Sequence, residues 1–163
     1  MVHEKSQNRM IAAELARFGA RTFVIEQLTG LATSTVRKVI RDSTGGRHIC
    51  GLLPYCSDWY EERPERLMHC ALFLRLFEHD RMDRSGLPGR VFLNAYTRYR
   101  NMMNLDETTF RSNATLSINQ VYIAIRLLST GELSHRTCKS CGSRYVEGRD
   151  RSAADTCRIC HTP

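Results

Sequence analysis

Two pairs of cysteines near the end of the chain have the spacing of a metal site. Cys138 and Cys141 are separated by two residues, as are Cys157 and Cys160, and fifteen residues lie between the pairs. A two-residue gap lets one tight turn aim both sulfurs at a single ion, and two such turns complete the tetrahedron of structural zinc. We therefore predict one structural zinc ion per chain on these four cysteines.

Other occupants of this motif are disulfides or an iron–sulfur cluster, and His135 or His161 could replace one ligand. Catalytic zinc fits less well, because four thiolates close the coordination shell and leave no position for water. Gly142, directly after the second sulfur, suits the positive φ that such a turn often needs. The stretch between the pairs is long enough for a short hairpin but has no core, so metal binding would supply its folding free energy.

The other three cysteines, Cys50, Cys56 and Cys70, have no partner at this spacing and are expected to be buried structural thiols. A nucleophilic Cys70 would need a base facing it, and neighbouring His69 points about 100° away on a helix. The chain also lacks a P-loop, a dinucleotide-binding glycine motif and a zinc-protease motif. We expect no enzyme, and hence no catalytic residue, organic cofactor or small-molecule substrate.

A second pattern, in residues 24–41, is typical of a DNA-binding helix-turn-helix. A first helix ends at Gly30, and a second begins near Thr33 and Ser34, two good N-cap residues. In such motifs the second helix enters the major groove while its apolar face packs on the first. The predicted DNA-facing residues are Ser34, Thr35, Arg37, Lys38 and Arg41, and the predicted core residues are Val36, Val39 and Ile40. The alternative is an ordinary helical hairpin with a solvated basic face.

The overall charge favours an anionic partner. The formal net charge is +7 and the pI about 9.3. Four thiolates and one Zn²⁺ would lower the charge by two, to about +5. Almost all basic residues are arginine, whose planar donor fork suits phosphates and guanine edges; GC-rich codon usage is an alternative cause. The excess positive charge lies in residues 1–50 and 131–163, and the middle is nearly neutral.

The periodicity of apolar residues predicts a mainly α fold. Three short helices occupy residues 11–42, a longer one begins at Pro64, and two more cover residues 92–103 and 117–128. We divide the chain into a helix-turn-helix-like DNA-binding region (1–50), a helical body and partner interface (51–131), and a small zinc-ribbon-like unit with the four cysteines (132–163).

The middle of the chain carries more apolar stripes than one small helical layer needs, together with Tyr55, Trp59 and Tyr60. Large apolar patches usually mark protein interfaces, so we predict a protein partner there; the alternative is that the stripes pack on one another. The first residues are polar and no apolar run approaches a membrane span, so we expect no signal peptide, no membrane and a reducing cytoplasm.

Several stretches along the whole chain together carry a family resemblance: Leu15-Ala16-Arg17-Phe18-Gly19-Ala20-Arg21, the helix-turn-helix-like segment, Gly51-Leu52-Leu53-Pro54-Tyr55-Cys56-Ser57-Asp58-Trp59-Tyr60, Ala95-Tyr96 with Tyr99, and the cysteine pairs. With these features the chain resembles the FlhC family of flagellar transcriptional regulators. The resemblance implies a DNA-binding activator that works with FlhD in a hetero-oligomer, drives RNA polymerase at flagellar promoters and holds zinc on the four cysteines. Family members usually continue as a tail beyond the second pair, whereas this sequence stops at Pro163. A zinc-ribbon adaptor that binds protein instead of DNA is the competing function.

Overall fold

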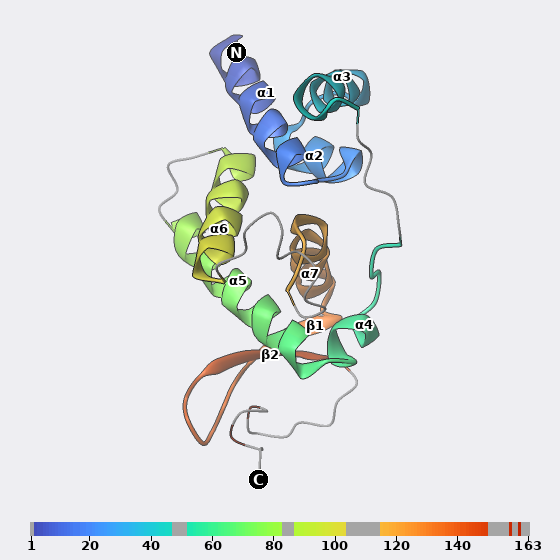
Figure 1. Ribbon diagram of the computed structural model, residues 1–163. Coiled ribbons are helices and arrows are strands. Elements are labelled where there is room, and N and C mark those ends of the chain that lie inside the picture. The colour runs from blue at the N-terminus through green and yellow to red at the C-terminus, as the bar shows by residue number, and fades with distance from the viewer. Residues whose placement is uncertain are drawn as a thin grey trace.

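The computed structural model describes residues 2–46, 52–82, 87–103, 115–149, 157 and 160. Figure 1 shows three stacked parts: helices α1 to α3 at one end, α4 to α7 in the middle, and a two-stranded sheet at the other end. The elements are α1 (Val2–Arg17), α2 (Thr22–Thr29), α3 (Thr33–Thr44), α4 (Asp58–Glu61), α5 (Pro64–Met82), α6 (Pro88–Met102), α7 (Ile118–Thr130), β1 (Leu133–Thr137) and β2 (Arg144–Gly148). The predicted mainly α fold is confirmed. None of the described helices has the length and apolarity needed to span a membrane.

The three N-terminal helices form where the sequence predicts them. Gly30 ends α2 with φ 65°, a left-handed conformation that glycine adopts without the steric cost of a Cβ. Residues 30–32 turn the chain directly into α3, which packs on α1 and α2. The predicted caps are wrong: Ala32 is the N-cap and no side chain caps the helix, because Thr33 and Ser34 already lie in its first turn.

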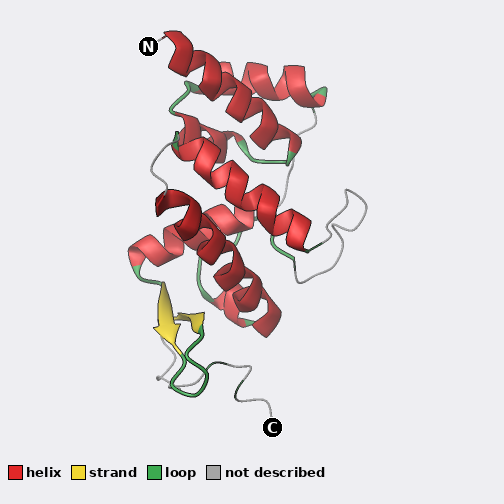
Figure 2. Cartoon of the chain, turned by 90° about the vertical axis from the view of Figure 1, so that its left-hand side faces the viewer, coloured by secondary structure: helices red, strands yellow, loops and turns green. Residues whose placement is uncertain are grey.

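The helical body has an aromatic core, and its helices are seen side by side in Figure 2. Phe73 of α5 packs edge-on against Phe92 and Tyr99 of α6, and all three are fully buried. Helix α7 begins with a capping box, in which Ser117 and Gln120 exchange side-chain and backbone hydrogen bonds. The apolar stripes of α5, α6 and α7 therefore pack largely on one another.

The N-terminal helices and the body share one continuous hydrophobic core. Gly89 of α6 lies where a Cβ would come within 2.8 Å of the Leu28 carbonyl oxygen and 2.9 Å of Ile11 Cγ2. The side chain of Asn119 on α7 accepts from the Arg21 amide at 2.8 Å and donates to the Gly19 carbonyl at 2.9 Å. The two parts are thus joined by close packing and by paired polar groups.

Most apolar side chains on the described helices in the middle of the chain are buried within the chain itself. Tyr60 is fully buried, and Trp59 is half-buried beneath the Arg66 guanidinium, which lies 3.8 Å from the ring centroid. Large apolar side chains that do remain exposed are scattered over several elements: Met10, Leu52, Tyr55, Met68, Met82 and Met102. Most of the apolar stripes on the described helices are therefore buried by packing within the chain itself.

The two strands of the C-terminal hairpin flank the first cysteine pair. Strand β1 precedes Cys138, and β2 follows Gly142, with Thr137 paired to Arg144 in an antiparallel ladder. The first cysteine pair is therefore the turn of the hairpin. Strand β2 lies in the stretch between the cysteine pairs that was expected to be long enough for a short hairpin, and its partner is β1, because the Cys-x₂-Cys turn reverses the chain. Residues 150–156 of that stretch lie outside the described residues.

Candidate metal centre and nucleic-acid interface

The first cysteine pair sits in a tight turn built by backbone hydrogen bonds. The Gly142 amide donates to the Cys138 carbonyl at 2.8 Å, and the Cys138 amide donates to the Ser143 carbonyl at 2.9 Å. Gly142 has φ 70°, as predicted for a residue directly after the second sulfur. A turn of this shape leaves both sulfurs free to approach one ion.

The four sulfurs come together in space although the pairs are distant in sequence. The ligand atoms of Cys138, Cys141, Cys157 and Cys160 all lie within 4.8 Å of one another. The Cys141 and Cys157 sulfurs are 3.7 Å apart, and a tetrahedron with Zn–S bonds of about 2.3 Å has edges of about 3.8 Å. A disulfide needs about 2.05 Å, and the several irons of a cluster would hold the sulfurs farther apart. The donor set fits a single ion such as zinc.

The hydrogen bonds around the sulfurs favour thiolate at part of the site. The Cys157 amide donates to the Cys138 sulfur at 3.2 Å, and this bond, with further backbone donors, lowers the pKa of Cys138 to about 6. The side chain and amide of Ser143 lower the pKa of Cys141. The neighbouring sulfurs of Cys141 and Cys157 instead raise the pKa of Cys160 to about 12. A metal cation bound among the sulfurs would stabilise the negatively charged form of Cys160, so that all four cysteines could be thiolates.

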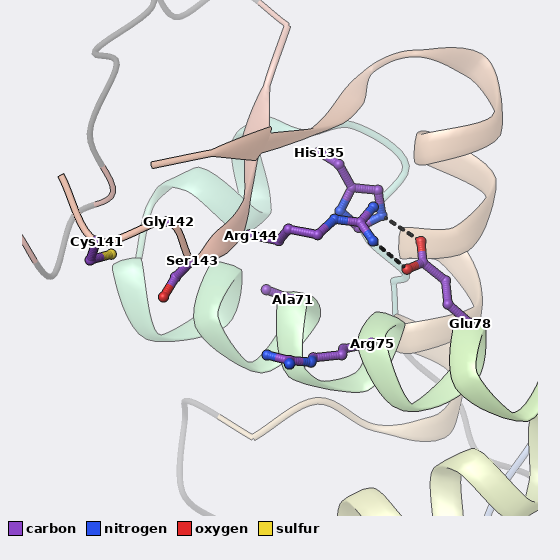
Figure 3. A pocket seen from close by; sticks show the side chains of 8 residues that line it. All are labelled: Ala71, Arg75, Glu78, His135, Cys141, Gly142, Ser143 and Arg144. Atoms are coloured by element: carbon purple, nitrogen blue, oxygen red, sulfur yellow. Dashed lines mark hydrogen bonds and ion pairs between the residues drawn. The ribbon is translucent and has the colours of Figure 1, made fainter. Parts of the chain in front are cut away.

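His135 has a different partner and does not join the cysteine cluster. Its Nε2 lies 3.0 Å from Oε1 of Glu78 on α5, and the other Glu78 oxygen pairs with Arg144 at 3.0 Å. Figure 3 shows this contact at one end of a hollow of about 470 Å³, with Cys141 toward the other end and Arg75 along its floor. The alternative that His135 replaces a cysteine ligand is wrong, and His161 lies outside the described residues.

The remaining cysteines divide into two kinds. Cys70 is fully buried among apolar side chains, and burial raises the pKa of its thiol to about 12, so it matches the inert structural thiol expected. Its neighbour His69 turns away to the Tyr99 hydroxyl, 2.9 Å from Nδ1. Cys56 is exposed, which corrects the expectation that it is buried, and Cys50 lies outside the described residues.

Helix α3 has one buried face and one exposed basic face. Val36 and Ile40 are buried and Val39 is half-buried, as predicted, because they pack on α1 and α2. Of the predicted DNA-facing residues, Thr35 is half-buried and the other four are exposed: Ser34, Arg37, Lys38 and Arg41. Thr22, Arg37, Arg41 and Gly46 line an open hollow of about 620 Å³ beside this face.

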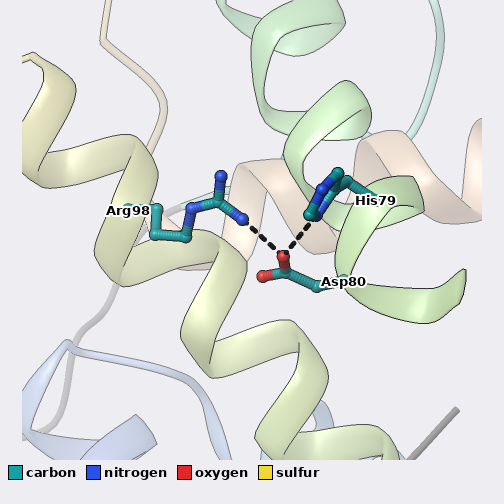
Figure 4. A network of polar contacts seen from close by, with 3 residues as sticks. All are labelled: His79, Asp80 and Arg98. Atoms are coloured by element: carbon teal, nitrogen blue, oxygen red, sulfur yellow. Dashed lines mark hydrogen bonds and ion pairs between the residues drawn. The ribbon is translucent and has the colours of Figure 1, made fainter. Parts of the chain in front are cut away.

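The basic residues of α3 differ from many arginines of the body in having no acidic partner among the residues that the structure describes. Within the described parts of the chain, no ion pair engages Arg37, Lys38 or Arg41. The arginines that do pair with carboxylates lie elsewhere: Arg66 with Glu62, Arg90 with Glu14, Arg98 with Asp80, Arg136 with Glu147 and Arg144 with Glu78. In Figure 4, for example, Asp80 of α5 lies between Arg98 of α6 and His79. The unpaired charge on α3 is therefore available to an external anion.

Two acidic residues that contact the cysteine unit were missed by the sequence analysis. Glu61 is half-buried and accepts from the Gly148 amide at 3.3 Å. Glu78 bridges two residues of the hairpin, His135 and Arg144. Neither role has a local signal, because both contacts join segments that are far apart in the sequence.

Known proteins similar to this chain match it over nearly its whole length. The sequence profile of the family described as Flagellar transcriptional activator (FlhC) matches residues 1–163. The flagellar transcriptional regulator FlhC of Cupriavidus pinatubonensis is 31% identical over 163 residues, covering 98% of this chain and 74% of that protein. The FlhC proteins of Gallionella capsiferriformans (26% over 161 residues; 98% and 86% covered) and Proteus mirabilis (23% over 155 residues; 94% and 78% covered) are also similar.

Proposed function

Because the chain belongs to the FlhC family of flagellar transcriptional activators, we propose that it binds DNA at flagellar promoters through the exposed face of α3. The family is one of transcriptional regulators, which is not an enzyme class. On this proposal the chain works in the cytoplasm, in a hetero-oligomer with FlhD, and recruits or activates RNA polymerase. The predicted resemblance to FlhC is confirmed, while DNA, FlhD and polymerase binding belong to the proposal.

The observation that carries the DNA-binding proposal is the unpaired basic face of α3. Arg37 and Arg41 are one helical turn apart and lie beside the same hollow, with Lys38 exposed between them. Phosphate contacts from such side chains provide affinity, and arginine can also form two hydrogen bonds to a guanine edge. A packed inner face anchored by Val36 holds this outer face rigid.

We propose further that Cys138, Cys141, Cys157 and Cys160 hold one structural zinc ion. Their sulfur separations and the hydrogen bonds to Cys138 support a closed four-thiolate site. Zinc would contribute folding free energy to a hairpin that contains few buried side chains of its own.

A gel shift on a flagellar promoter fragment, with and without FlhD, tests the DNA-binding proposal. We expect a specific complex whose affinity falls steeply as salt rises, because phosphate contacts release counterions. A chain that binds FlhD but gives no shift on any DNA would support the competing function, a zinc-ribbon adaptor that binds only protein.

A further inference from the structure

Strand β2 is fastened to the helical body at its first residue. Arg144 begins the strand and pairs with Glu78 of α5 at 3.0 Å, while the second Glu78 oxygen lies 3.0 Å from His135 of β1 (Figure 3). One carboxylate thus holds both strands of the hairpin. Arg144 is only three residues beyond Cys141, so this contact lies at the edge of the cysteine turn.

The last residue of β2 is fastened in the same way by a second carboxylate. The Gly148 amide donates to Oε1 of Glu61 on α4 at 3.3 Å, and a Cβ on Gly148 would overlap the Glu61 carboxylate. Between the two ends, Val146 and Glu147 are buried. Strand β2 therefore contacts α5 at its start and α4 at its end.

The α4 end of this contact continues into the rest of the molecule. Tyr60, next to Glu61, donates its hydroxyl to the Gln120 carbonyl on α7 at 2.6 Å. Asn119, next to Gln120, holds the connection between α1 and α2 through Arg21 and Gly19. Two pairs of neighbouring residues, one on α4 and one on α7, thus link the hairpin to the start of the helix-turn-helix-like segment.

We infer that Glu61 and Glu78 are positioning residues that couple the state of the four-cysteine centre to the helical body. The inference rests on the zinc binding proposed above. Loss of the ion would free the turn between Cys138 and Ser143, and β2 would lose the fixed start that presents Arg144 to Glu78. The contact of Gly148 with Glu61 would loosen with it, and α4 would transmit the change to α7 and to residues 19–22.

The fluorescence of a tryptophan on α4 can report this coupling. Trp59 is the one tryptophan of the sequence and lies on α4, two residues before Glu61. Its ring contacts the Arg66 guanidinium at 3.8 Å and the Tyr60 ring at a centroid distance of 5.0 Å. A shift of α4 would change these contacts and therefore the Trp59 emission.

The first experiment removes zinc from the full chain with a chelator under reducing conditions. Zinc release is followed with a metal-sensing dye, Trp59 by its emission, and the backbone by amide hydrogen exchange. We expect the Trp59 emission to change together with zinc release, and exchange to rise in the hairpin, α4, the first turn of α7 and residues 19–22, but not in the middle of α6. Zinc release with unchanged Trp59 emission and unchanged exchange in α4 would overturn the inference.

The second experiment tests the two carboxylates directly. The pair Glu61→Ala with Glu78→Ala should release zinc roughly three- to tenfold faster than the parent chain, because the carboxylate contacts with Gly148, Arg144 and His135 are all lost. The pair should also uncouple Trp59 emission from zinc removal. Glu65→Ala, the same kind of substitution at an exposed position of α5, is the control for each single carboxylate variant and should behave as the parent. Gly148→Ala should reproduce the Glu61 effect with both carboxylates intact, since its Cβ displaces that carboxylate.

A charge swap separates positioning from general loss of stability. Arg144→Glu alone should speed zinc release, and adding Glu78→Arg should restore most of the parental rate and Trp59 response, although His135 loses its partner. Failure of the swap to restore either readout, or a Glu61/Glu78 double variant that keeps the parental zinc release and Trp59 response, would refute the positioning role. A chain that holds no zinc when purified without chelator would instead refute the metal proposal itself.

Discussion

Arg37 is the most informative single residue of the proposed DNA-binding face. It is exposed on α3 and has no ion-pair partner among the described residues. Replacing it by alanine should weaken DNA binding by about 1–3 kcal/mol if it contacts a base, and by less, equally for all sequences, if it contacts a phosphate. Fluorescence anisotropy on promoter and random duplexes would distinguish the two.

Arg126→Ala is the matched control, because it removes the same charge from an exposed position on α7. It should leave the affinity nearly unchanged. If binding persists after Arg37, Lys38 and Arg41 are replaced together, α3 is a scaffold. The basic residues of the cysteine unit then become the leading candidates: Arg144, Arg149, Arg151 and Arg158.

The cysteine ligands are also testable one at a time. Replacing Cys141 or Cys157 by serine should abolish stoichiometric zinc and increase hydrogen exchange in β1 and β2 before the helical body is affected, because the hairpin has little core of its own. Cys56→Ser is the control, since Cys56 is exposed and lies outside the cluster. Elemental analysis would contradict the prediction if a serine variant still bound one zinc ion per chain.

At the level of elements, the packing of α6 against α1 and α2 depends on Gly89. A Cβ there would approach the Leu28 carbonyl oxygen to 2.8 Å, and backbone cannot move aside cheaply. Gly89→Ala should therefore lower the free energy of unfolding by about 1–3 kcal/mol, as overpacking does in close-packed cores. Urea unfolding checks this, with exposed Asn94→Ala on the same helix as the control; equal midpoints would contradict it.

At the level of the whole molecule, the exposed apolar side chains raise the question of whether the chain needs a protein partner to remain soluble. Leu52 is fully exposed and Met82 is 84% exposed. We predict that the chain alone self-associates or is poorly soluble, and that co-expression with FlhD rescues it. Sedimentation velocity with and without FlhD measures this, and a stable monomer that ignores FlhD would defeat the prediction.

Features that depend on local spacing could be predicted from the amino-acid sequence alone. The period of Val36 and Ile40 gives the inner face of α3, Gly30 and Gly142 give left-handed turns, and Ser117 begins α7, because each effect acts within a few residues. The four cysteines could be predicted as candidate metal ligands for the same reason, because each Cys-x₂-Cys spacing is a local signal. The resemblance to FlhC, now confirmed, extended these local signals to the whole chain.

How the parts of the molecule face one another depends on contacts between segments that are distant in the sequence. The contacts of Glu61 with Gly148 and of Glu78 with Arg144 join residues 87 and 66 positions apart, and no local periodicity encodes such a pairing. The same holds for Cys56, whose exposure depends on how its segment lies on the body, and for the apolar stripes of α5 to α7, whose burial depends on mutual packing. Periodicity identifies the face that a helix buries, but the surface that covers it is set by packing between distant segments.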